Sequence, residues 1–185
     1  MTHKELYQEL NYVNHSREKR HYYAQLVINQ PTLIPLLLDI LFMTTDKISA
    51  RAAWVLEFLC KEHLEYFLPY LDVFLSRIHQ VTIDSALRPC AKICEYTADA
   101  YFGSAPHPVK KILQPQHKEA IIEACFDWLI TEQKVAVKAY AMHILFLFGK
   151  ETDWIHPELK IILERDFNHQ SAAFKARSRH ILKKI

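Results

Sequence analysis

This chain of 185 residues contains only two glycines, Gly103 and Gly149. Tight hairpin turns and phosphate-binding loops depend on glycine, because glycine adopts positive φ angles without a steric penalty. The scarcity of glycine therefore argues against a fold rich in β-hairpins, against a P-loop and against a G-x-G-x-x-G nucleotide site. Helices joined by polar turns remain as the expected architecture.

A strong charge of one sign and long apolar runs are also lacking. The formal net charge is +2 with the histidines neutral, which by itself indicates neither nucleic acid nor an anionic membrane as the partner. No uncharged apolar run reaches about 18 residues, so neither a membrane-spanning helix nor a membrane partner is predicted. The first residues lack the apolar segment of a secretory signal.

Cysteine is scarce as well, and all four cysteines lie inside apolar helical runs. Free cysteine commonly acts as a small buried hydrophobe, and disulfides are rare in reducing compartments. We therefore expect buried, reduced thiols and a cytoplasmic location. Cys90 and Cys94 share one helix face, but no second Cys or His pair follows at zinc spacing, so core packing is the better interpretation.

Motifs for metal binding and nucleophilic catalysis are missing too. The chain has 11 histidines, yet no H-E-x-x-H or similar ligand spacing occurs. His107 and His117 flank an irregular stretch, and two histidines alone do not predict a metal site there. No serine lies in a G-x-S-x-G motif. The sequence therefore predicts no catalytic residue, no metal and no cofactor.

What the sequence does contain is an internal repeat. The block Lys138–Leu145 returns thirty-seven residues later as Lys175–Leu182, and Arg51 and Arg88 are separated by the same interval. Self-similarity at a period of about 20–50 residues is typical of stacked repeat proteins. The step from Arg88 to Lys138 is thirteen residues too long, which predicts an inserted loop at about residues 102–116 of a single domain, 1–185.

Hydrophobic periodicity predicts helix pairs along the whole chain. Pro35 is expected in the first turn of its helix and Pro69 is expected to kink its helix, because proline lacks an amide hydrogen. Ser16 is a candidate N-cap and Gly149 a candidate C-cap. The expected pairs are a Leu6–Leu10–Val13 stripe with 17–28, 33–42 with 48–60, 64–79 with 87–101, 116–130 with 135–148, and 157–167 with 172–185.

Two helices of this pattern differ in how their apolar residues are distributed. The helix Val135–Phe148 is apolar nearly all round, as expected for a helix packed between neighbours. The last helix is one-sided: Phe174, Ser178 and Ile181 share a face, and cations surround the other. That distribution is expected of a terminal repeat.

The pairs resemble HEAT repeats, a family with a proline in the first helix, an Asp at the turn and an Arg or Lys opening the second helix. The resemblance covers essentially the whole chain. It implies an all-α fold, a right-handed α-α superhelix (solenoid) of about five HEAT-like helix pairs. The clearest matching positions are Pro35, Asp46 and Arg51 in the second pair and Pro69, Asp84 and Arg88 in the third.

HEAT proteins usually bind other macromolecules along the surface formed by their second helices. The resemblance therefore implies a non-enzymatic interaction module that presents a curved helical surface to a protein or peptide partner. The alternative is a nucleic-acid-binding protein similar to the AlkD-like DNA alkylation repair glycosylases, which use Asp, Trp and Arg. Asp127 and Trp128 are adjacent and point about 100° apart on a helix, so they do not supply that set. A third alternative is an enzyme whose residues assemble from distant repeats.

One basic residue recurs at the same position of each second helix, and these residues form a basic ladder: Arg17, Arg51, Arg88, Lys138 and Lys175. Such a ladder either lines an anion-binding groove or pairs with acids and carbonyls of nearby turns, and recurrence at a structural position favours the second interpretation. The cations of the last helix either contact phosphates or form a solvated face that suits the helix dipole. The candidate partner- or anion-binding residues are Arg17, Arg51, Arg88, Lys138, Lys175 and Arg179.

Several aromatic and histidine positions favour packing roles. His143 and His180 occupy equivalent positions of the repeated block, which suggests a shared packing role. Trp54 and the Tyr22–Tyr23 pair are predicted to lie in the core, although an exposed aromatic would be able to anchor a partner.

Overall fold

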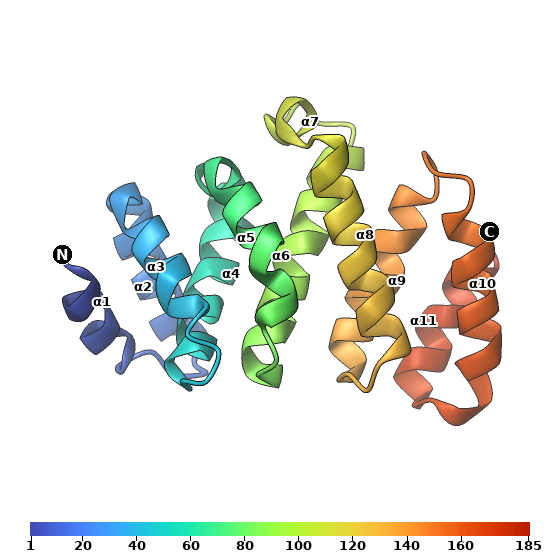
Figure 1. Ribbon diagram of the computed structural model, residues 1–185, viewed down its shortest axis with the longest axis horizontal. Coiled ribbons are helices and arrows are strands. Elements are labelled where there is room, and N and C mark those ends of the chain that lie inside the picture. Colours follow the sequence, from blue (N-terminus) through green and yellow to red (C-terminus); the bar gives the residue numbers. More distant parts are fainter. The chain divides into compact units, whose positions relative to one another are not determined.

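The computed structural model describes all 185 residues, and it is helical throughout with no β-strand (Figure 1). The predicted all-α class is therefore confirmed. By its internal contacts the chain divides into two compact units, Met1–Tyr96 and Thr97–Ile185. The division falls within the helix α6, Asp84–Phe102.

The first unit is built around α4, which packs against α1, α2 and α3. Contacts on several sides account for its long run of buried residues, among them Ala52, Ala53, Leu56 and Leu59. The bounds are α1 His3–Leu10, α2 Arg17–Asn29, η1 Pro31–Leu33, α3 Ile34–Leu41, α4 Ile48–Phe67, η2 Leu68–Tyr70, α5 Leu71–Arg77 and η3 Ile78–Gln80.

Short polar side chains lie at the start of α2 and α4. The Ser16 hydroxyl accepts a hydrogen bond from the Lys19 amide at 3.2 Å, so the predicted N-cap of α2 is confirmed. Asp46, the turn residue of the second pair, accepts from the Ile48 amide at 3.0 Å and from the Tyr7 hydroxyl at 2.7 Å. These two hydrogen bonds hold the pKa of the Asp46 carboxyl below its usual value.

The predicted boundary between Cys60 and Leu64 lies at a break in the helix. The helix α4 continues to Phe67 and is interrupted only at His63, whose φ and ψ are −141° and 64°. The stretches before and after His63 correspond to the predicted helix that ends near Cys60 and the predicted helix that begins near Leu64. The expected break at Pro69 takes the form of the short 3₁₀ segment η2, whereas Pro35 lies in the first turn of α3 as predicted.

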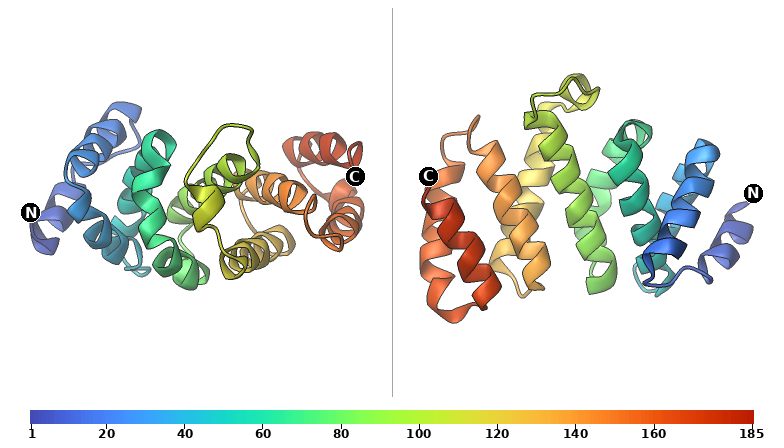
Figure 2. Two further views of the ribbon diagram at one scale, coloured as in Figure 1. Left: turned by 90° about the horizontal axis from the view of Figure 1, so that it is seen from above. Right: turned by 180° about the vertical axis from the view of Figure 1, so that it is seen from behind.

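The second unit is organised around α9, which contacts α8, α10 and α11 (Figure 2). The prediction that this all-round apolar helix packs between neighbours is confirmed. In α11 the face with Phe174, Ser178 and Ile181 is buried, and Arg177 and Arg179 are exposed. The bounds are α7 Val109–Ile112, α8 Pro115–Ile130, α9 Val135–Phe148, α10 Ile155–Asp166, η4 Phe167–His169 and α11 Ala172–Leu182.

The connection from α6 to α8 contains the short helix α7 and is anchored at two buried side chains, Val109 and Leu113 (Figure 1). Both nearby histidines serve the backbone. His107 Nδ1 accepts from the amide of Val109, and His117 Nδ1 accepts from the amide of Gln114, both at 3.1 Å. The second of these bonds belongs to the capping box at the start of α8.

Length and hydropathy show no single helix able to cross a membrane. The helix α2 and the stretch Pro31–Leu41 reach the required length and mean hydropathy only when taken together, and the chain bends by 108° between them.

Gly149 is the C-cap residue of α9, as predicted, but its φ of −63° needs no left-handed backbone. The His156 ring approaches this glycine closely: a Cβ at position 149 would lie 2.0 Å from His156 Cδ2, so an alanine there would force the His156 side chain to shift. The imidazole is held in place by a 2.9 Å hydrogen bond from its Nε2 to the Phe146 carbonyl, and it stacks on the Phe146 ring.

We expect Gly149→Ala to lower the free energy of unfolding by about 1–3 kcal/mol, because the added methyl group forces the His156 ring out of its position. Urea unfolding measures the change. In a His156→Ala background the same substitution should cost much less, since the clashing ring is gone. An equal cost in both backgrounds would contradict this explanation.

Candidate anion-binding site

The basic ladder divides into residues with different surroundings. Arg51 Nη1 donates to the carbonyls of Leu10 and Asn11, at 3.3 and 2.7 Å, where α1 ends. Lys138 is buried and donates to the Leu129 carbonyl at 2.9 Å, in the last turn of α8. The last carbonyls of a helix lack partners within the helix, so these two cations cap the ends of other helices. Burial lowers the pKa of Lys138.

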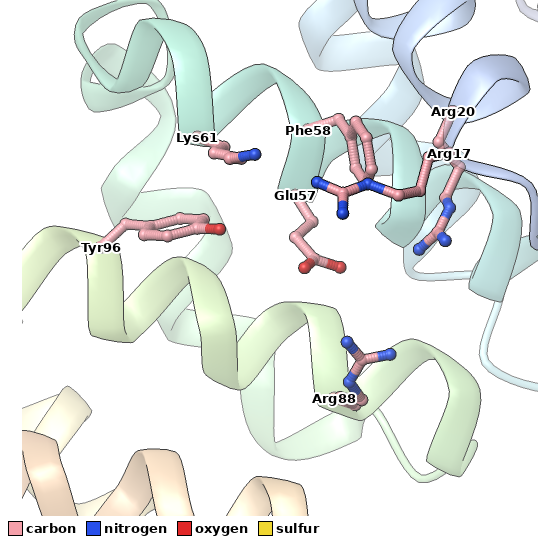
Figure 3. Close-up of a pocket in the computed structure, with 7 residues that line it drawn as sticks. All are labelled: Arg17, Arg20, Glu57, Phe58, Lys61, Arg88 and Tyr96. Carbon is pink, nitrogen blue, oxygen red and sulfur yellow. The ribbon is translucent and has the colours of Figure 1, made fainter.

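Arg17 and Arg88 are exposed and make no hydrogen bond or ion pair within the chain. Both line one pocket of about 250 Å³ in the first unit, between α2, α4 and α6 (Figure 3). The fold thus brings together two ladder positions that are far apart in the sequence. The other residues that line this basic pocket are Arg20, Glu57, Phe58, Lys61 and Tyr96.

Arg20 forms a fixed wall of the basic pocket. Its guanidinium donates to the carbonyl of Ser16 at 3.3 Å and to that of His15 at 2.6 Å. The same group lies 4.9 Å from the Phe58 ring centroid and 5.9 Å from that of Trp54. Hydrogen bonds and cation–π contacts together hold this charge in one place before any ligand arrives.

Glu57, in α4, lies at the centre of the basic pocket. Its side chain points into the space bounded by Arg17, Arg20 and Arg88 (Figure 3). The residue is only 7% exposed, and its Oε2 atom is buried without a hydrogen-bond partner. Desolvation raises the pKa of the carboxyl, and the positive charges of Arg88, Arg20, Lys92 and Lys61 offset this effect only in part.

Sequence reasoning missed Glu57, although a signal was present. It is the only charged residue in the apolar run from Ala52 to Cys60. Buried polar atoms are nearly always hydrogen-bonded, so an unpaired one that faces a pocket calls for an explanation. A pocket in which four cationic side chains surround a buried carboxylate is suited to bind an anion that also carries a hydrogen-bond donor. The cations attract the anion, and the carboxylate accepts the hydrogen bond.

The helix α6 adds a second acid to this region, but that acid is paired. Glu95 is 6% exposed and forms an ion pair with Lys92. The Lys92 ammonium also lies 5.0 Å from the Tyr96 ring centroid. Of the two buried glutamates, only Glu57 has a fully buried oxygen without a hydrogen-bond partner.

The two remaining candidates lie in the second unit. Lys175 is half-buried, and Arg179 is exposed with its guanidinium 5.5 Å from the Phe167 ring centroid. Arg179 and Phe167 line a second pocket together with Glu164 and Leu182. This pocket holds no buried, unpaired polar atom comparable to that of Glu57.

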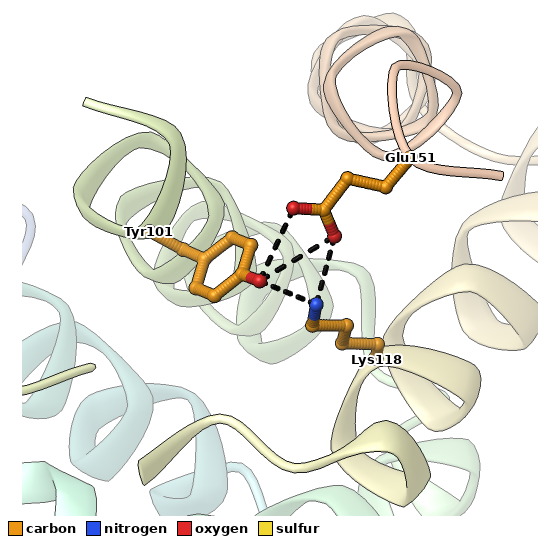
Figure 4. Close-up of polar contacts among 3 residues, drawn as sticks. All are labelled: Tyr101, Lys118 and Glu151. Carbon is orange, nitrogen blue, oxygen red and sulfur yellow. Dashed lines mark hydrogen bonds and ion pairs between the residues drawn. The ribbon is translucent and has the colours of Figure 1, made fainter. Parts of the chain in front are cut away.

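A polar cluster in the second unit links the end of α6 to α8 and to the segment after α9 (Figure 4). The Lys118 ammonium donates to the Tyr101 hydroxyl and, at 2.8 Å, to Glu151. The Tyr101 hydroxyl donates to Glu151 at 3.2 Å. Desolvation lowers the pKa of Lys118, but these hydrogen bonds outweigh it and the net shift is upward. The three groups satisfy one another, so we interpret the cluster as a structural cross-link.

Some predicted packing roles are wrong. His143 is half-buried and its Nε2 lies 2.7 Å from the Asp99 carboxylate, whereas His180 is exposed, so the two do not share a role. Tyr23 is buried as predicted, but Tyr22 is 60% exposed. Trp54 is half-buried against Arg20 rather than enclosed in the core.

All four cysteines are buried and free, in agreement with the core interpretation. Burial raises the pKa of Cys60 and Cys90 well above the usual value and that of Cys94 to about 12. No group of three or more His, Cys, Asp or Glu side chains is arranged to hold a metal ion.

No protein-family model, curated protein or solved structure matches this chain.

We expect Glu57→Gln to raise the free energy of unfolding at pH 7 by about 1 kcal/mol, because it replaces an unpaired buried charge with a neutral side chain. A raised folded-state pKa means that the penalty in the wild type is complete above that pKa and absent below the unfolded value of 4.5. The stability gain of the variant should therefore fade as the pH falls toward 4.5. Urea unfolding at both pH values measures it.

Glu95→Gln is the matched control, because Glu95 is equally buried but paired with Lys92. That substitution should lower stability at pH 7, since it removes the ion pair between Glu95 and Lys92. A loss of stability in Glu57→Gln at pH 7, or a gain that does not depend on pH, would contradict the assignment of Glu57 as an unpaired buried charge.

Proposed function

We propose that this protein is a non-enzymatic interaction module that binds a protein or peptide partner. The proposed architecture is a right-handed solenoid of about five HEAT-like helix pairs. The repeat of thirty-seven residues supports it, as does the packing of successive helices within each unit. In that architecture α2, α4 and α6 are second helices, and all three contribute to the basic pocket.

The observation that carries the proposal is the chemical state of the basic pocket. Arg17 and Arg88 make no hydrogen bond or close ion pair within the chain, although Arg88 attracts Glu57 electrostatically, and Glu57 has a buried, unsatisfied oxygen. Each of these features costs free energy or leaves binding capacity unused in the isolated protein. A site of this kind is expected where a partner supplies the missing anion and the missing donor.

The distribution of cations favours a protein partner over the backbone of a nucleic acid. Proteins that follow a nucleic acid strand place cations along an extended track. In the first unit the ladder residue Arg51 is occupied by the end of α1, and the free cations converge on one pocket. The small net charge of +2 points the same way. An acidic or phosphorylated peptide segment fits a convergent cluster of this kind.

Affinity capture from native lysate tests the proposal. The wild-type protein should enrich at least one protein, and Arg17→Gln/Arg88→Gln should lose that enrichment about tenfold while remaining folded by circular dichroism. Lys19→Gln is the control, because Lys19 is an exposed cation on α2 that lies outside the basic pocket. Enrichment that survives the double substitution would remove the pocket from the proposed function.

Nucleic-acid binding of the AlkD-like type is the second candidate, and one observation favours it. Trp54, Glu57 and Arg20 lie together on second helices, which approximates a Trp, acid and Arg set with Glu in place of Asp. The Trp54 ring is partly covered by Arg20, and its N–H donates to the Ser85 carbonyl at 2.9 Å. Stacking on a base would therefore require Arg20 to move.

The dependence of DNA and RNA affinity on salt separates the two candidates. If the pocket binds a nucleic acid, the affinity should fall steeply between 50 and 200 mM salt, by about 10³-fold for six phosphate contacts, because each contact releases counterions. Fluorescence anisotropy with a labelled oligonucleotide measures this. Absent binding at low salt, or a flat response, would remove the second candidate.

A further inference from the structure

The charges of the basic pocket define the anion that it suits. Arg17 and Arg88 present unpaired guanidinium groups from different helices, and Lys61 adds an exposed ammonium. A phosphomonoester carries a charge of about −1.5 to −2 and three strong acceptor oxygens. It can accept bidentate hydrogen bonds from each of two guanidinium groups, whereas a carboxylate has only two oxygens and a single charge. The pocket therefore suits a phosphate better than an acidic side chain.

Glu57 adds a second requirement. A pocket that bound only an anion would gain nothing from a carboxylate at its centre, because that charge repels the ligand. The Glu57 carboxylate lines the pocket and its Oε2 atom has no hydrogen-bond partner within the chain, so we infer that this carboxylate accepts a hydrogen bond from the ligand. The ligand therefore combines a phosphate with an N–H donor on a neighbouring atom group, as a phosphorylated residue and the adjoining peptide amide do.

The size of the basic pocket limits how much of a partner enters it. A volume of about 250 Å³ is at or below the lower end of typical small-molecule sites, which start at about 300 Å³. It accommodates one modified side chain with its adjoining backbone rather than a whole helix. Phe58 and Tyr96 provide apolar surface for the aliphatic part of such a segment.

We propose that the basic pocket binds a phosphorylated serine or threonine of a protein partner, with the phosphate between Arg17 and Arg88 and an adjoining peptide N–H donating to Glu57. The inference rests on the proposed function and specifies its ligand. Arg20 is held by the Ser16 and His15 carbonyls and by the Phe58 ring, so it contributes a fixed field rather than a mobile contact. Glu57 favours a phosphate with a neighbouring N–H donor over an anion that has no hydrogen-bond donor.

The test uses the full chain and a labelled peptide library with a fixed central phosphoserine between random residues. Libraries with serine or glutamate at the centre are the matched controls, and anisotropy reports binding. The phosphoserine library should bind at least tenfold more tightly than either control, and Arg17→Gln/Arg88→Gln should remove that preference. Lys19→Gln should retain it. Equal binding of the three libraries would overturn the inference.

The Glu57→Gln variant tests the donor requirement separately. Sulfate, which has no hydrogen-bond donor at neutral pH, serves as the competitor. Loss of a charge-assisted hydrogen bond weakens peptide binding, and loss of the negative charge strengthens sulfate binding. The preference for the phosphoserine library over sulfate should therefore fall about tenfold or more. An unchanged preference would show that Glu57 does not contact the ligand.

Failure of this inference can be distinguished from failure of the proposed function. Treating the lysate with a protein phosphatase before affinity capture should abolish an enrichment that depends on Arg17 and Arg88. An enrichment that depends on both arginines but survives phosphatase treatment would support the proposed protein-binding function. It would contradict the proposal that the ligand is phosphorylated. Displacement of the peptides by an oligonucleotide that binds more tightly would also overturn the inference, in favour of a nucleic acid.

Discussion

A helix that is apolar on most of its surface must be covered on most of its surface, and this constraint organises both units of the protein. In the first unit α4 is covered by α1, α2 and α3, and in the second α9 is covered by α8, α10 and α11. Burial of apolar side chains is the main favourable term in folding. Few positions on such central helices face solvent. A polar residue there therefore needs a hydrogen-bond or ion-pair partner, either from the chain or from a bound ligand.

Glu57 occupies such a position on α4, and its state differs from that of the other buried polar groups. Lys138 donates to a carbonyl and Glu95 pairs with a lysine, whereas one oxygen of Glu57 has no partner. An arrangement that lowers the stability of the folded chain is characteristic of binding sites, where function and stability compete. The surrounding arginines offset part of the desolvation cost of the carboxylate, but they do not donate a hydrogen bond to its buried oxygen.

The basic ladder illustrates how one repeated sequence position acquires different roles. Arg51 and Lys138 each lie within reach of the last carbonyls of a helix, which need donors from outside that helix. Arg17 and Arg88 make no such hydrogen bond, and their guanidinium groups line the pocket around Glu57. The interpretation as structural pairing therefore applies to Arg51 and Lys138, and Arg17 and Arg88 instead line the basic pocket.

The sequence by itself determined the helical class, the buried stripes of Leu6 and Phe174, the cap at Ser16 and the burial of the cysteines, because each follows from local periodicity or local hydrogen bonding. It did not determine that the chain bends sharply at His63 instead of passing through a longer loop, because no proline or glycine marks that position. Nor did it identify Glu57. In the sequence, a charged residue in an apolar run has the same appearance whether or not it has a partner in the folded chain. Only the packing of α2, α4 and α6 decides which cations lie near Glu57 and whether any of them donates a hydrogen bond to it.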